Sequence, residues 1–318
     1  MTQPLITPVA FFIFNRPDTT RRVFEEIRKV RPATLLVVAD GPRTPAEASK
    51  CRETRAIIET VDWPCRVLKN YSETNLGCKI RVSSGLDWVF DEVEEAIILE
   101  DDCLPSQSFF FFCQELLNRY RNDERIMHIT GDNFQATNKD FNCPESYYFT
   151  HITHIWGWAS WRRAWRHYDV NVRQWPAVKQ SHLLSKLFRE DGAVARWEEK
   201  FQDYYEGKIN SWDGQWSLAC FAAGGLCVVP RLNLISNIGL VDATHAAHRE
   251  SHKLFDIEAH ELDFPLVHPR NISVNIEAEN FVQEYMFGVH NYRGFGQRLR
   301  RLAKKHAPGL YSLLKRAK

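Results

Sequence analysis

The sequence lacks an excess of either charge. Lys and Arg together number 41 and Asp and Glu number 40 in 318 residues, which leaves a formal net charge of +1. A protein that binds nucleic acid through overall basicity needs a large positive excess to displace counterions from phosphates. We therefore expect no nucleic-acid partner. Positive charge gathers only at the end, because residues 293–318 contain Lys and Arg but no Asp or Glu.

Long apolar runs are also missing. The run at residues 9–14 is followed at once by Asn15 and Arg16, so it is too short for a spanning helix or a secretory leader. The eight cysteines contain no C-x-x-C pair and no small-domain disulfide framework. We expect reduced, mostly buried thiols and a cytoplasmic protein. No repeat or low-complexity linker divides the chain.

What the sequence does contain is an alternation of short apolar runs with helical segments. This order is typical of an α/β fold, in which helices cover both faces of a mainly parallel sheet. The predicted strands are residues 9–14, 34–39, 66–70, 96–99 and 126–129. The predicted helices are residues 19–30, 45–60, 77–90 and 107–121.

The middle third is rich in tryptophan. Eight of the ten tryptophans lie between Trp156 and Trp216, and indole rings stack well on sugar rings. The spacing of Trp158, Trp161 and Trp165 predicts one face of a helix, a face that more often packs inward. We expect two halves of one domain, at residues 1–150 and 151–285, followed by a basic amphipathic tail at residues 286–318.

Polar residues follow the predicted strands. Asn15 and Arg16 follow the first, Asp40 the second, and Glu100, Asp101 and Asp102 the fourth. Ligands of open α/β sheets bind at these carboxyl ends. Three adjacent carboxylates raise one another's pKa unless a cation neutralises them, and Mg²⁺ or Mn²⁺ prefers carboxylate, water and diphosphate oxygens. The cluster therefore predicts a divalent metal site, with a solvated acidic turn as the alternative.

The segment from Ile97 to Asp102 resembles the E-D-D form of the D-x-D motif in GT-A glycosyltransferases, particularly N-acetylglucosaminyltransferase I and its relatives. The resemblance covers residues 6 to 250. It extends to these further elements: Asn15-Arg16-Pro17, Asp40-Gly41, Asn75-Leu76-Gly77 with Lys79 and Arg81, Gly157-Trp158, and Trp212-Asp213-Gly214-Gln215-Trp216. The last is similar to the family's W-D-D-W element, but Gly214 replaces the second Asp.

The resemblance implies a GT-A fold with a nucleotide-sugar half and an acceptor half. It implies metal-dependent sugar transfer with inversion. The implied donor is a nucleotide sugar, with UDP as the expected nucleotide, and the implied acceptor is a saccharide or a lipid-linked glycan. The enzyme would be a bacterial-style soluble protein of surface-glycan assembly. Asp102 would bind the metal, Asp101 the ribose or a metal-bound water, and Glu100 the sugar side. The implied donor pocket further includes Asn15, Arg16, Asp40, Lys79, Arg81, Trp156 and Trp158.

Each role has a plainer alternative. Asp40 begins a good turn sequence, and Lys79 and Arg81 suit a solvated helix face. An inverting enzyme needs a base for the acceptor hydroxyl. Asp213 is the candidate, although it equally suits the cap of the helix that follows.

Two later segments complete the predicted site. His245 or His248 would add a metal ligand from a late loop, or both are ordinary surface histidines. The basic tail is predicted to lie on an anionic membrane, with a solvated terminal helix as the alternative.

Three other functions stay open. A sugar nucleotidyltransferase typically opens with a Gly-rich loop that bears a basic residue, and residues 11–20 contain no glycine. A non-catalytic carbohydrate-binding protein explains the tryptophans but not the acidic cluster. An inactive relative would keep the fold and much of this sequence.

Overall fold

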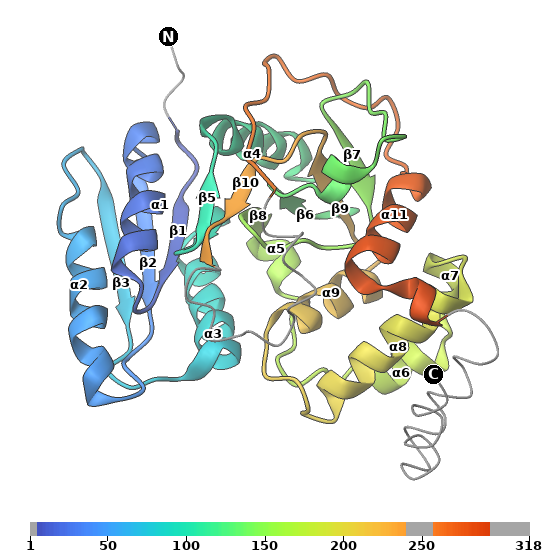
Figure 1. Ribbon diagram of the computed structural model, residues 1–318, viewed down its shortest axis with the longest axis horizontal. Coiled ribbons are helices and arrows are strands. Elements are labelled where there is room, and N and C mark those ends of the chain that lie inside the picture. The colour runs from blue at the N-terminus through green and yellow to red at the C-terminus, as the bar shows by residue number, and fades with distance from the viewer. Residues whose placement is uncertain (1–4, 240–256, 293–318) are drawn as a thin grey trace.

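The computed structural model describes residues 5–239 and 257–292 (Figure 1). Within these ranges eight strands form one sheet, in the order β3-β2-β1-β4-β8-β6-β9-β7. The strands are β1 (Val9–Ile13), β2 (Thr34–Ala39), β3 (Arg66–Tyr71), β4 (Glu95–Glu100), β6 (Ile126–Thr130), β7 (Tyr147–Thr150), β8 (Trp158–Trp161) and β9 (Leu226–Pro230). In the same ranges no helix has both the length and the apolarity to cross a membrane.

The four strands β3, β2, β1 and β4 run parallel. Beyond β4 the sheet becomes mixed, because β8 lies antiparallel between β4 and β6 and β7 lies antiparallel to β9. The predicted fold class, a mixed and mainly parallel α/β sheet, is therefore confirmed. The five predicted strands are confirmed to within about a residue at each end.

Helices cover both faces of this sheet. The helices of the first half are α1 (Pro17–Val30), α2 (Ala48–Ile58), α3 (Gly77–Glu92) and α4 (Gln107–Tyr120). Successive residues of β1 belong to different cores: Phe11 packs with α1, α2 and α4, whereas Phe12 packs with α3. Because side chains of a strand alternate between faces, a strand covered on both sides is apolar throughout, as β1 is.

The second half adds a third core between helices. The helices are α5 (Arg162–Trp165), α6 (Trp175–Gln180), α7 (Leu183–Leu187), α8 (Asp191–Tyr205), α9 (Asp213–Ala222) and α11 (Ile276–Phe287). Trp197 and Phe201 of α8 pack against Phe221 of α9 in this core. The helix expected after Asp213 is thus confirmed as α9. Residues 293–318 of the predicted tail lie outside the described residues.

The tryptophan segment folds differently from its prediction. Trp158 and Trp161 belong to β8, and only residues 162–165 form a short helix. The helical prediction is wrong because β8 is covered on both faces, so its apolar residues do not alternate with polar ones, and periodicity cannot separate such a strand from a buried helix. Trp158 is 0% exposed and stacks against His128 and Trp212. Its predicted contact with a sugar is therefore wrong.

Candidate active site

The carboxyl ends of β1, β2 and β4 meet at one edge of the sheet. Phe12 of β1 pairs in register with Glu100, the last residue of β4. Asp101 and Asp102 form the turn that follows, and β5 (Cys103–Pro105) leads away from it. Residues 14–16, which follow β1, therefore lie beside the acidic cluster.

Arg16 lies between the two aspartates of this acidic turn. Its Nη1 donates to Asp102 Oδ2 at 2.7 Å and lies 3.7 Å from Asp101 Oδ1. The other oxygen of Asp101, Oδ2, accepts the backbone N–H of Phe14 at 3.0 Å. The structure therefore brings Arg16 together with Asp101 and Asp102, three residues that the sequence assigned to the same donor pocket.

Negative charge at the acidic turn exceeds what Arg16 compensates. Burial, together with the neighbouring Asp102 and Asp101, raises the pKa of Glu100 to about 8. Burial and Asp102 raise the pKa of Asp101 to about 7. Burial opposes the charged form of Arg16, but Asp101 and Asp102 outweigh it and raise the pKa of the guanidinium. A further cation would relieve this repulsion.

Asp102 is also covered by the chain that leaves β10 (Ile235–Asn237), the antiparallel partner of β5. The backbone N–H of Ile238 donates to the carbonyl of Asp102 at 2.8 Å. A Cβ atom on Gly239 would lie 2.3 Å from Asp102 Oδ2. Glycine at residue 239 therefore leaves room for the carboxylate, a constraint that no sequence motif indicated.

The acidic turn offers the oxygen ligands that Mg²⁺ or Mn²⁺ prefers. Its carboxylates fit such an ion because they repel one another when ionised, and a cation would stabilise their charged form. In residues 5–239 and 257–292, no group of three or more His, Cys, Asp or Glu side chains is arranged to hold a metal by itself. His245 and His248 lie outside the described residues. Among the described residues, a metal on Asp102 would leave ligand positions open for diphosphate and water oxygens.

Asp40 closes the beginning of α3. Its Oδ1 accepts the N–H of Leu76 at 2.9 Å and its Oδ2 that of Gly77 at 3.1 Å. A carboxylate at a helix N-terminus satisfies N–H groups that lack helical partners. These contacts give Asp40 a structural role at the start of α3, which differs from the turn role that its sequence suggested, and its role in binding a nucleotide stays a prediction.

The other predicted pocket residues divide by burial. Arg81 is only 7% exposed and donates from Nη2 to the carbonyl and Oδ1 of Asn70 in β3. The solvated-face alternative is therefore wrong for Arg81, whose pKa burial lowers. Lys79 is half-buried on the same helix, and Asn15 donates to Glu47 at 3.2 Å. Trp156 is half-buried against Phe134.

Asp213, the predicted base, lies at the start of α9. Its Oδ1 accepts hydrogen bonds from Ser211 Oγ and from Tyr204 Oη, the latter at 2.9 Å, and Lys200 Nζ lies 3.6 Å from Oδ2. Burial opposes ionisation, but Lys200 and the hydroxyls outweigh it and lower the pKa of Asp213. The capping residue of α9 is Trp212, and Asp213 points its carboxylate at α8 instead.

Cys78 interacts electrostatically with both carboxylate sites. It is the exposed member of the eight cysteines, which are all free thiols and mostly buried, as predicted. Desolvation by the surrounding protein atoms, and then the carboxylates of Glu100 and Asp213, raise the pKa of its thiol to about 12. Asp213 also raises the pKa of Glu100. The acidic turn and Asp213 are therefore close enough to influence each other's pKa, and both influence the pKa of Cys78.

Sequence reasoning missed a buried carboxylate at the end of β6. Asp132 is 2% exposed and accepts hydrogen bonds from the Thr130 hydroxyl and the Trp156 backbone N–H. Burial raises its pKa to about 7 despite these bonds. The signal was available, since Asp132 follows a strand as Glu100 does. Its contacts hold the loop before β8 against β6.

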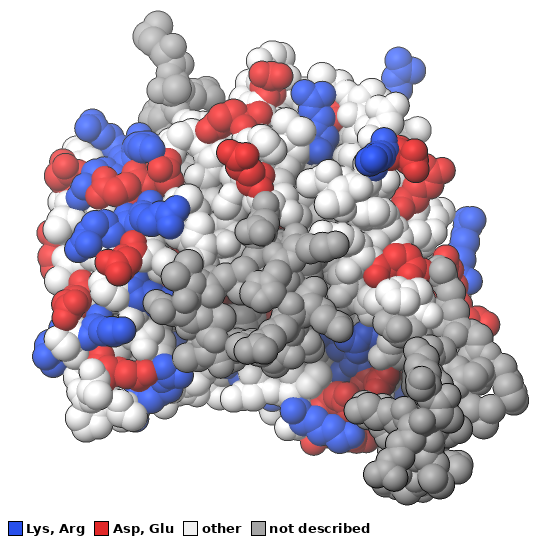
Figure 2. Space-filling model, in the orientation of Figure 1, with Lys and Arg blue, Asp and Glu red and all other residues white. Residues whose placement is uncertain are grey.

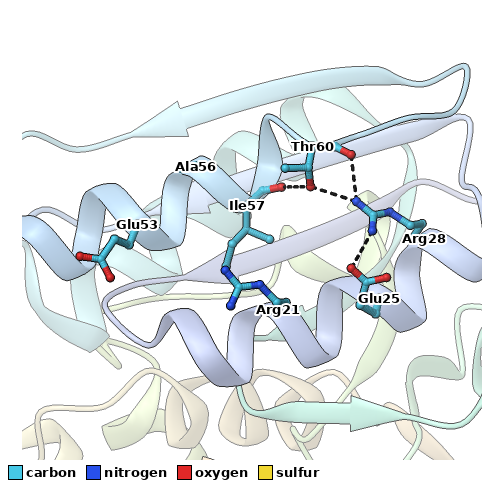
Figure 3. Close-up of a pocket in the computed structure, with 7 residues that line it drawn as sticks. All are labelled: Arg21, Glu25, Arg28, Glu53, Ala56, Ile57 and Thr60. Atoms are coloured by element: carbon cyan, nitrogen blue, oxygen red, sulfur yellow. Dashed lines mark hydrogen bonds and ion pairs between the residues drawn. The ribbon is translucent and has the colours of Figure 1, made fainter.

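A separate hollow of about 420 Å³ lies between α1 and α2, away from every predicted site residue (Figure 3). Its lining contains two arginines and two glutamates, so their charges balance, and Arg28 donates to Glu25 at 2.7 Å and to the Thr60 carbonyl at 2.9 Å. Figure 2 likewise shows positive and negative side chains interspersed over α1 and α2, on the left of the view. This hollow therefore offers no unbalanced charge to a ligand.

No protein-family model matches the chain, and no curated protein matches it. Solved structures that are similar include a UDP-glucose pyrophosphorylase complexed with UDP-glucose, at 10% identity and a TM-score of 0.38 over 74% of this chain and 94% of that one. A 4-diphosphocytidyl-2C-methyl-D-erythritol synthase from Anaerococcus prevotii has 9% identity and a TM-score of 0.37, over 70% and 88%. Mouse xyloside xylosyltransferase 1 has 12% identity and a TM-score of 0.32, over 67% and 81%.

Proposed function

We propose that the protein is a metal-dependent glycosyltransferase of the GT-A type. It moves a sugar from a nucleoside-diphosphate sugar, with UDP as the nucleotide, to a saccharide or glycan acceptor with inversion. The observation that carries this proposal is the pairing of two unlike carboxylate sites that are close enough to influence each other's pKa. The carboxylates of the acidic turn repel one another when ionised, whereas Asp213 is held ionised by Lys200 and two hydroxyl groups.

The acidic turn supplies the donor side of this proposal. Asp102 would ligate Mg²⁺ or Mn²⁺ with support from Asp101, and the bound ion would neutralise charge on the departing diphosphate. Arg16 Nη1 lies 2.7 Å from Asp102 Oδ2, and this proximity supports a role for its guanidinium in binding the same phosphate oxygens. Glu100 would contact the sugar.

Asp213 supplies the acceptor side. The acceptor hydroxyl oxygen forms a bond to the anomeric carbon while the bond from that carbon to the diphosphate oxygen breaks. The electron pair of the broken bond leaves with the nucleoside diphosphate, and Asp213 takes the hydroxyl proton. An ionised carboxylate suits this task because its pKa lies below neutral pH, so the proton-accepting form is present.

A thermal-shift screen of nucleotides and nucleotide sugars, with and without Mn²⁺, tests the donor half. Ligand at about 100 times its Kd stabilises the native state by about 2.7 kcal/mol, so UDP or a UDP-sugar with Mn²⁺ should raise the unfolding midpoint. If UDP, GDP and dTDP all leave the midpoint unchanged and calorimetry detects no binding, the proposal is wrong.

Product analysis separates the rival functions. Incubation with UDP-sugars, Mn²⁺ and mixed oligosaccharides should release UDP together with an extended saccharide. Formation of pyrophosphate from UTP and a sugar 1-phosphate would instead indicate a nucleotidyltransferase. Binding of oligosaccharides with neither reaction would indicate a carbohydrate-binding protein.

A further inference from the structure

Three side chains surround the carboxylate of Asp213 at close range. Tyr204 Oη donates to Oδ1 at 2.9 Å, and Ser211 Oγ donates to the same oxygen. The Lys200 ammonium faces Oδ2 at 3.6 Å, which is ion-pair distance but longer than a good hydrogen bond. Oδ1 is therefore occupied by two hydroxyl donors, and Oδ2 is the oxygen that has the better opportunity to accept a proton.

Lys200 is itself held in an aromatic enclosure. Its Nζ lies 5.0 Å from the ring centre of Trp197, 5.4 Å from that of Phe287 and 5.9 Å from that of Tyr204. The side chain is 14% exposed. Burial lowers the pKa of Lys200, but ring faces attract a cation and stabilise the ammonium form. The enclosure also fixes the ammonium beside Asp213.

Gly214 makes this arrangement sterically possible. A Cβ atom on Gly214 would lie 2.0 Å from Tyr204 Cε2 and 2.3 Å from Cζ. The Tyr204 ring therefore fills the space that any larger residue at 214 would need. Gly214 is also the position where the chain departs from the W-D-D-W element. In this chain a tyrosine hydroxyl on Asp213 accompanies the loss of the second carboxylate.

We propose that Lys200 and Tyr204 are positioning residues for the base: they orient the Asp213 carboxylate and keep it ionised, and Gly214 admits the Tyr204 ring. This inference rests on the proposed function, in which Asp213 takes the acceptor proton. It assigns to α8 a part in the chemistry that no motif of the sequence indicated.

The charged and titratable groups around Asp213 come from several elements. Lys200 and Tyr204 lie on α8, with Arg196 one turn earlier acting on Lys200. Glu100, Cys78 and Tyr168, on other elements, also interact electrostatically with Asp213. Loss of the Lys200 charge or the Tyr204 hydroxyl removes an interaction that lowers the pKa of Asp213. The protonated, inactive form then persists to higher pH.

The test compares kcat against pH for Lys200→Gln and Tyr204→Phe with two controls on the same segment. Tyr205→Phe alters an exposed neighbour, and Lys208→Gln removes an exposed ammonium. We expect both test variants to lower kcat by about tenfold, part of the 10²- to 10⁴-fold that a general base supplies. In both variants, the fall of kcat on the acidic side of the pH profile should move to higher pH, while the KM for the donor stays unchanged. Lys200→Arg should keep the wild-type pH profile.

A second measurement tests the packing of Gly214. Gly214→Ala should lower the unfolding midpoint in the wild-type background, and that cost should disappear in a Tyr204→Ala background because the clashing ring is gone. Equal costs in both backgrounds would show that Tyr204 does not exclude a side chain at 214.

The outcomes separate this inference from the proposed function. If Asp213→Asn keeps full transfer, Asp213 is not the base and both fail. If Asp213→Asn is inactive while Lys200→Gln and Tyr204→Phe match the wild type in kcat and in pH profile, only the positioning roles fail. If no transfer is found, a carbon-13 NMR titration of the Asp213 carboxyl decides the charge effect, since its pKa should rise in Lys200→Gln and an unchanged pKa contradicts it.

Discussion

The acidic turn and the Asp213 site both bury carboxylates, yet their pKa values move in opposite directions. At the acidic turn, neighbours along the chain are themselves carboxylates, and the pKa values of Glu100 and Asp101 are raised. At α9, the neighbours are an ammonium and two hydroxyls, and the pKa of Asp213 is lowered. Burial costs are similar in kind, so the partners decide the sign.

This difference suggests different uses. A cluster that repels itself gains free energy by binding a cation, whereas a carboxylate with fixed donors is already stable as an anion. The first therefore suits a metal with its diphosphate, and the second suits a proton acceptor. The following experiments test whether the two sites can be separated in this way.

The largest expected effect is at Asp213. Asp213→Asn keeps the shape of the side chain but cannot take the acceptor proton, so kcat should fall by about 10²-fold or more. Nucleotide binding, measured by calorimetry, should survive. The matched control is Asp203→Asn, which alters a carboxylate of α8 that pairs with Lys208. Loss of nucleotide binding in Asp213→Asn would show that the two sites are not separable.

The next effect is at Asp102. Asp102→Asn removes a charge from the acidic turn, and Mn²⁺-dependent nucleotide binding should weaken by about tenfold or more because a hard cation prefers a charged oxygen ligand. Asp18→Asn on the exposed start of α1 controls for charge alone. Unchanged Mn²⁺ dependence in Asp102→Asn would show that the metal does not bind at the acidic turn.

A smaller effect is expected at Gly239. Gly239→Ala would bring a methyl group to 2.3 Å from Asp102 Oδ2, so the carboxylate must shift. We expect the Kd for nucleotide with Mn²⁺ to rise severalfold, while the Mn²⁺-independent part of binding stays the same. Wild-type affinity in this variant would mean that the position of Asp102 is not critical for the donor.

The smallest effect concerns Cys78, which reports on both sites. Only the thiolate is alkylated, and a pKa of about 12 leaves little thiolate at pH 8. Glu100→Gln and Asp213→Asn should each speed the reaction of Cys78 with iodoacetamide severalfold, as followed by mass spectrometry. Asp18→Asn should not. If the alkylation rate of Cys78 rises in just one of the two variants, the other site does not influence its thiol.

The sheet and the acidic turn were predictable from the sequence because their signals are local. Four of the five predicted strands were largely apolar runs, whereas β3 mixes apolar and polar residues, and the three carboxylates were adjacent. The helix at α9 also followed from its sequence. In contrast, Trp158 was assigned to a helix, since a short strand buried on both faces has no alternating pattern.

Partners distant in sequence were not predictable. Asp40 accepts hydrogen bonds from the N–H groups of Leu76 and Gly77, which lie 36 and 37 positions later in the sequence. Arg81 points inward and donates to Asn70. Composition and spacing indicate which residue types are present, but a hydrogen bond needs positions within about 3 Å. Only packing of helices against the sheet sets such positions.

The sequence by itself determined the strand order along the chain, the carboxylates at the end of β4 and the presence of a carboxylate at residue 213, because each depends on neighbouring residues. Tertiary structure alone placed Arg16 between Asp101 and Asp102, and brought Lys200 and Tyr204 to Asp213. These contacts lower the pKa of Asp213 and oppose the rise in the pKa of Asp101, because electrostatic interactions depend on distance in space rather than along the chain.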